Sequence, residues 1–150
     1  MKINVPLSLA SALLVLFSCS PHRDAIEINE NKPGGLYELA QNGKQFKSYN
    51  SDESYLVDTT TFISFADFHY FEKQESDHEG TYSFNFQLTD EGTLKFKEMT
   101  GRNISKQICF IIGDKVVIAP IVQGIIPNGM VSVTIVDEKA AGEIIEFLKK

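Results

Sequence analysis

Cysteine is scarce in this chain of 150 residues, which contains only Cys19 and Cys109. Cys109 lies in the apolar run 108–112, where we expect a small buried side chain without a partner. The two cysteines therefore predict no disulfide framework. Packing must stabilise the folded part, and the sequence supplies eleven phenylalanines and five tyrosines for it.

Motifs that carry catalysis are also missing. The sequence has no Gly-x-Ser-x-Gly elbow to expose a nucleophile and no glycine-rich loop to cradle a phosphate. Neither His-x-x-x-His nor Cys-x-x-Cys spacing is present, so we expect no closed metal site. These absences predict that the protein is not an enzyme and has no cofactor, and a hydrolase is the least favoured function.

The histidines are His22, His69 and His78. His22 belongs to a polar segment, and His69 is expected at the surface or the edge of a strand. His78 stands among three acidic residues within 75–79, a group that could hold a divalent cation. A solvated loop is the favoured interpretation, so no metal site is predicted.

Basic residues are fewer than acidic residues in this chain. The chain has 14 lysines and arginines against 20 acidic residues, a formal net charge of −6. This balance argues against a nucleic-acid partner and against adsorption to anionic lipid.

No hydrophobic run is long enough to span a bilayer comfortably. The longest, residues 5–17, follows the basic Lys2 as in a signal peptide. It leads into Cys19, with Leu16 three positions before the cysteine and Ser18 directly before it. This is the pattern of a bacterial lipoprotein signal, in which the cysteine thiol receives a diacylglycerol and acyl chains such as palmitate.

The predicted cleavage divides the chain into three parts. Residues 1–18 are the lipoprotein signal peptide, residues 19–54 a polar tether with room for short elements, and residues 55–150 the folded domain. Lipid on Cys19 would hold the domain in the cell envelope, outside the cytoplasm. Ser20 does not resemble an Asp-type retention signal, which favours the outer membrane over the inner one. The alternative is an ordinary secretory signal that ends near Ser20.

The folded domain reads as a mixture of strands and helices. Apolar and polar residues alternate in 82–88 and 131–135, as in strands with one buried face. Thr89 and Asp137 are suited to cap helices, and Gly113-Asp114 marks a hairpin. Further strands are expected over 108–112 and 116–122. The pattern predicts an α+β fold, a two-layer sandwich of an antiparallel or mixed sheet with two helices on one face.

Aromatic residues crowd the segment 60–71, more than one face of one strand can hold. Either they belong to a larger core that residues 36–56 complete, or they form an exposed apolar patch that binds a peptide or partner. Phe65, Phe68 and Phe71 are the candidate binding residues for the second alternative. In the helix after Thr89, three apolar residues are expected to face the core: Leu94, Phe96 and Met99.

Two stretches carry a resemblance to a known family. One is the run from Phe86 to Gly92, followed by Phe96 and Thr100; the other is 106–120, which ends in Ala-Pro. Ile125, Gly129 and 137–140 complete the match. In this order they resemble the head of the first periplasmic domain of SecD and SecDF, the protein-export membrane proteins. Ser105 stands where that family has a glycine, and the six transmembrane helices and the base that holds the head have no counterpart here.

The resemblance implies a SecDF-head-like fold in a stand-alone, lipid-anchored protein, with scaffold roles for Gly92, Phe96, Thr100 and Pro120. It also suggests contact with exported or unfolded chains. We therefore expect a non-catalytic envelope lipoprotein whose partners are the membrane, through lipid on Cys19, and a polypeptide or envelope protein. The alternative is a structural accessory subunit of a larger envelope complex.

The anchor is testable at Cys19. Cys19→Ala should abolish incorporation of labelled palmitate, because no other residue of the signal can be acylated in this way. The measurement is metabolic labelling followed by immunoprecipitation, with Ser20→Ala as the control that keeps the label. Labelled Cys19→Ala protein, or release of the wild type in soluble form, would contradict the lipoprotein interpretation.

Overall fold

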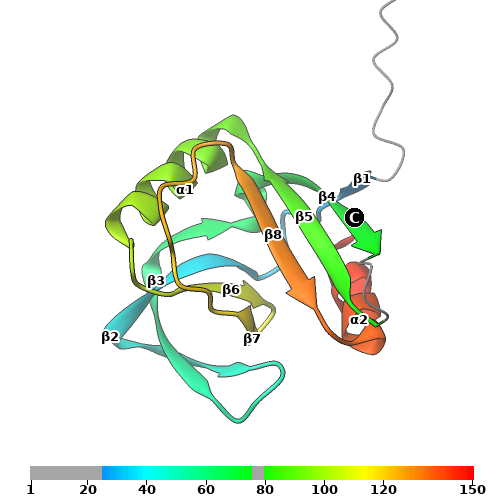
Figure 1. Cartoon of the computed structure of the whole chain (residues 1–150), viewed down its shortest axis with the longest axis horizontal. Coiled ribbons are helices and arrows are strands. Elements are labelled where there is room, and N and C mark those ends of the chain that lie inside the picture. Colours follow the sequence, from blue (N-terminus) through cyan, green and yellow to red (C-terminus); the bar gives the residue numbers. More distant parts are fainter. Residues whose placement is uncertain (1–24, 76–79) are drawn as a thin grey trace, which may run out of the picture.

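Eight strands and two α-helices make up the described part of the computed structural model, residues 25–75 and 80–150 (Figure 1). In chain order the elements are β1 (Ala25–Glu27), β2 (Gly34–Ser48), β3 (Ser54–Ser64), a short 3-10 turn (Phe65–Asp67), β4 (Phe68–Glu75), β5 (Tyr82–Leu88), α1 (Asp90–Arg102), β6 (Ile108–Ile112), β7 (Lys115–Ile118), β8 (Met130–Ile135) and α2 (Glu138–Leu148). The predicted lipidation site Cys19 and residues 76–79, which include His78 and two of its acidic neighbours, lie outside the described residues.

The strands form two four-stranded sheets. The first has the order β1-β4-β5-β8 and is antiparallel throughout. The second has the order β3-β2-β6-β7. Its long strand β2 pairs with β6 through residues 34–38 and, in parallel orientation, with β7 through Lys47 and Ser48. Because β2 pairs with both strands of the β6–β7 hairpin, the second sheet closes into a small ring.

Strand β6 lies between two hydrophobic clusters and is buried along its whole length. Ile108, Phe110 and Ile112 belong to the main core, together with residues of the first sheet and of both helices. Cys109 and Ile111 belong to a smaller cluster within the second sheet. Its other buried members are Tyr37, Phe46, Val57 and Val116. A strand buried on both faces is a continuous apolar run, which explains why 108–112 shows no alternation.

The predicted α+β sandwich is confirmed, and both helices contribute to the main core. α1 does so through Phe96 and Met99, as expected, and α2 through residues that include Ile144. The expectation for Leu94 is wrong, since its side chain is 64% exposed. The buried positions of α1 begin at Gly92 and recur at Phe96 and Met99, which leaves Leu94 on the solvent side.

The predicted tether over 19–54 needs a correction, because residues 34–48 form β2 and the folded part begins before residue 55. Gly34 and Gly35 indicated a flexible segment, yet both have a φ of +133° inside the sheet. A Cβ on Gly35 would lie 1.9 Å from the carbonyl oxygen of Ile63, so glycine lets β2 and β3 approach closely. The larger-core alternative is therefore the correct one, with Leu36 and Phe46 buried.

Helix α1 begins in close contact with the 3-10 turn. The Asp67 carbonyl oxygen accepts hydrogen bonds from the backbone N–H of Thr89 at 2.9 Å and from its hydroxyl at 3.1 Å. Thr89 also caps the helix by accepting from the N–H of Gly92 at 3.1 Å. A Cβ on Gly92 would stand 2.3 Å from the same Asp67 oxygen, which leaves no room for any side chain.

Gly92→Ala should therefore destabilise the protein by about 2 kcal/mol, because α1 must shift away from a backbone atom that cannot yield. Gly101→Ala in the same helix is the matched control. There the new Cβ would meet only Ile125 side-chain carbons at 3.8 Å and 3.9 Å, and alanine should add about 0.5 kcal/mol of stability. Denaturant unfolding measures both changes, and equal stabilisation by the two variants would show that the close approach at Gly92 is wrong.

Candidate functional site

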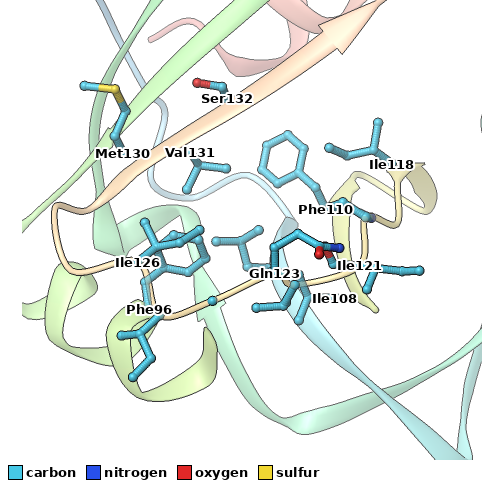
Figure 2. A pocket seen from close by; sticks show the side chains of 15 residues that line it. Phe96, Ile108, Phe110, Ile118, Ile121, Gln123, Ile126, Met130, Val131 and Ser132 are labelled. Carbon is cyan, nitrogen blue, oxygen red and sulfur yellow. The ribbon is translucent and has the colours of Figure 1, made fainter. Parts of the chain in front are cut away.

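An apolar groove of about 350 Å³ lies between β8 and the chain that follows β7 (Figure 2). Four core side chains, Leu36, Phe96, Ile108 and Phe110, line it from the inside. Ile118 and residues 120–126 form one side, and residues 130–132 of β8 form the other. The groove thus opens where the β6–β7 hairpin of the second sheet faces the last strand of the first sheet.

The lining changes from buried to exposed towards the mouth of the groove. Phe96 and Phe110 are 2% and 1% exposed and belong to the rigid core. Ile121, Ile125 and Met130 are about half exposed, at 54%, 55% and 48%. Large apolar side chains grouped at the rim of a cavity are typical of surfaces that bind another apolar molecule.

Among residues 25–75 and 80–150, no ionisable side chain lines the groove. The polar side chains of this described lining are those of Gln123 and Ser132, and the Ser132 hydroxyl already donates to Asn85 Oδ1 at 2.7 Å. A charged ligand would lose its hydration here without gaining a counter-charge. The groove is therefore suited to uncharged, apolar ligands.

Backbone hydrogen bonds hold the 120–126 side of the groove in place. The Ile108 N–H donates to the Pro120 carbonyl at 3.1 Å, and the Val122 N–H donates to the Lys106 carbonyl at 2.8 Å. The Ser105 N–H donates a hydrogen bond to the Val122 carbonyl at 2.9 Å. Ser105 has a φ of +66°, in the left-handed region that favours glycine.

Thr100 fixes the far end of the same segment. Its side chain is fully buried, and its hydroxyl donates to the Phe96 carbonyl at 2.8 Å. The same oxygen accepts from the Ile126 N–H at 3.1 Å. This hydrogen bond attaches the 120–126 side of the groove to α1. Thr100 is one of the residues for which the family resemblance implied a scaffold role.

The candidate binding residues Phe65, Phe68 and Phe71 are not part of this site. They are 0%, 5% and 0% exposed and lie in the main core. Phe65 and Phe68 pack against Phe110 at ring-centroid distances of 6.1 Å and 6.2 Å. Their assignment as binding residues is wrong, because the main core buries all three rings, with Phe71 packed against Phe84 and Phe86 of β5.

The titratable groups of the described residues give no sign of a reactive centre. Burial raises the pKa of the Cys109 thiol to about 12, so this thiol stays protonated and unreactive at neutral pH. His69 is exposed on β4. Within 25–75 and 80–150, no three His, Cys, Asp or Glu side chains are grouped as a metal site would require.

The sequence interpretation missed Ile121 and Met130 and noted Ile125 only as a family match. A signal was present, because the connection between β7 and β8 contains Ile121, Val122, Ile125 and Ile126 where a loop would normally be polar.

The part of the chain that the structure describes contains no helix long and apolar enough to cross a membrane.

Comparison with known proteins identifies relatives of this chain. A family model described as the SecDF P1 head subdomain matches residues 40–149. The protein translocase subunit SecD of Sebaldella termitidis is 37% identical over 60 residues, which are 40% of this chain and 15% of that protein.

Two solved structures are similar to the chain. SecDF in its super-membrane-facing form matches with a TM-score of 0.57 and 17% identity, over 82% of this chain and 18% of the solved one. A structure of SecDF, described as a membrane component that enhances protein export, matches with a TM-score of 0.58 and 16% identity, over 81% of this chain and 61% of the solved one. At these identities the likeness shows the fold alone, and the chain spans less than two thirds of each matched protein.

The tie between α1 and the groove wall is testable at Thr100. Thr100→Val keeps the shape of the side chain but leaves the partly buried Ile126 N–H without its acceptor, which should cost about 1 kcal/mol. Hydrogen exchange at Ile126 should accelerate, whereas Thr100→Ser, which retains the hydroxyl, should leave that exchange slow. Slow exchange at Ile126 in the valine variant would mean that the wall is held without this bond.

Proposed function

The chain belongs to the family of SecDF P1 head subdomains, and we propose that it is an envelope lipoprotein whose domain binds an apolar segment of polypeptide in the groove beside β8. The proposed role is non-catalytic. It would place the protein among the factors that contact exported or unfolded chains outside the cytoplasm.

The observation that carries this proposal is the chemistry of the groove. Its rim exposes Ile121, Ile125 and Met130, its interior is apolar, and none of the described lining residues carries a charge. Unfolded polypeptides expose apolar side chains that a folded protein would bury, and such a groove can shield them from water. A polypeptide supplies apolar groups in short runs, which fits a volume of about 350 Å³.

The proposed anchor is compatible with an accessible groove. Six residue steps separate Cys19 from Ala25, so the extended chain between them spans at most about 21 Å. The lipid would thus hold the β1 side of the first sheet close to a membrane. β1 and β8 are the two outermost strands of that sheet (Figure 1), and the groove lies beside β8.

The binding proposal is testable with a short synthetic peptide that has isoleucine at alternate positions, serine between them and a lysine at each end (the test peptide). Ile121→Asn combined with Ile125→Asn should weaken its binding by at least about tenfold, because each isoleucine loses burial worth about 1–2 kcal/mol. Fluorescence titration of the full-length protein in lipid nanodiscs measures the affinity.

Leu94→Asn is the control, since it makes the same kind of change on an exposed apolar residue that does not line the groove. Its affinity for the test peptide should stay within about twofold of the wild type. Equal losses in the control and the double variant, or no binding by the wild type, would contradict the proposed function.

A further inference from the structure

Strand β8 has an unpaired side that runs along the groove. It is the last strand of the first sheet, and among the strands of residues 25–75 and 80–150 it pairs only with β5. Met130, Val131 and Ser132, the first half of the strand, line the groove directly. A molecule lying in the groove would therefore lie against this side of β8 (Figure 2).

The register of β5 and β8 identifies the backbone groups on that side. The Leu88 N–H donates to the directly opposite Gly129 carbonyl at 2.9 Å, so this is a hydrogen-bonded pair. Such pairs alternate along an antiparallel ladder, which turns Val131 and Val133 towards β5. The backbone N–H and C=O groups of Ser132 and Thr134 consequently point away from β5, as does the Met130 carbonyl.

β1, the outermost strand on the opposite side of the first sheet, is covered, unlike β8. The end of the chain covers β1, with the Asn29 N–H donating to the Leu148 carbonyl at 2.7 Å and the Lys150 N–H to the Glu27 carbonyl at 3.2 Å. Proteins also protect outermost strands with charged residues or proline. β8 contains neither, since its sequence is Met-Val-Ser-Val-Thr-Ile.

We propose, on the basis of the proposed function, that the bound polypeptide segment adds to β8 as a further strand of the first sheet. Its backbone would pair with Ser132 and Thr134, and every second side chain would point to the face that Val131 shares with the groove. The uncharged lining selects segments whose inward side chains are apolar and uncharged. An acyl chain could fill the same volume, but it has no backbone groups to pair with β8.

Residue-resolved hydrogen exchange of the full-length protein in nanodiscs tests this mode of binding. Saturation with the test peptide should slow exchange of the Ser132 and Thr134 amides by at least about tenfold, while the Val131 and Val133 amides, already bonded to β5, change little. Protection of neither Ser132 nor Thr134 under saturating peptide would overturn the added strand and leave groove binding intact.

Ser132→Pro gives an independent test, because proline removes an outward donor and is tolerated on outermost strands. It should weaken binding of the test peptide at least about fivefold, with the Leu94→Asn control within about twofold of the wild type. Unchanged affinity in a folded Ser132→Pro protein would contradict strand addition.

Two versions of the test peptide, N-methylated at one or the other set of alternate residues, cover the case in which the proline variant fails to fold. Binding should be abolished only when the methyl groups replace the N–H hydrogens that face β8. Equal binding of both versions would overturn strand addition, while no binding of the unmodified peptide would overturn the proposed function itself.

Discussion

The burial of β6 on both faces is the constraint on which the rest of the structure depends. Phe110 stands at its centre, with the Phe65, Phe68 and Phe86 rings packed around it at centroid distances of 5.0–6.2 Å. On the other face, Cys109 and Ile111 require a cover of their own, which β2 and β3 supply with Tyr37, Phe46 and Val57. Without β2, half of the strand would be exposed to water, so the second sheet must curl around the hairpin.

The same arrangement creates the groove. The second sheet closes on itself through β2 and β7 and therefore does not continue into the first sheet. The chain from β7 must cross to β8, and after β7 ends at Ile118 only isolated bridges at Ile121 and Val122 continue the pairing. Thr100 and Lys106 hold the crossing segment at a fixed place, so the space between it and β8 stays open above Phe110. The closure of the second sheet thus produces both the apolar floor of the groove and the unpaired side of β8.

Local patterns predicted much of this fold. Alternation identified β5 and β8, Thr89 and Asp137 marked both helix starts, and the match at Gly92 corresponds to a real close contact. Long-range pairing was not accessible in the same way. Gly34-Gly35 looks like a flexible segment, and only the approach of β3 and β6 shows why glycine is needed there. The groove was missed because its residues come from separate elements, and Phe65, Phe68 and Phe71 were interpreted as a possible exposed patch although they are buried in the main core.

The central claim is that this neutral groove beside β8 receives an apolar polypeptide segment. Isoleucine-methyl NMR tests it most directly, because exposed isoleucines occur both inside and outside the groove. With the test peptide bound, the Ile121 and Ile125 methyl groups should show intermolecular contacts, while those of Ile104, 46% exposed but outside the groove, should show none. Contacts at Ile104 without contacts at Ile121 or Ile125 would place the binding surface elsewhere and contradict the account.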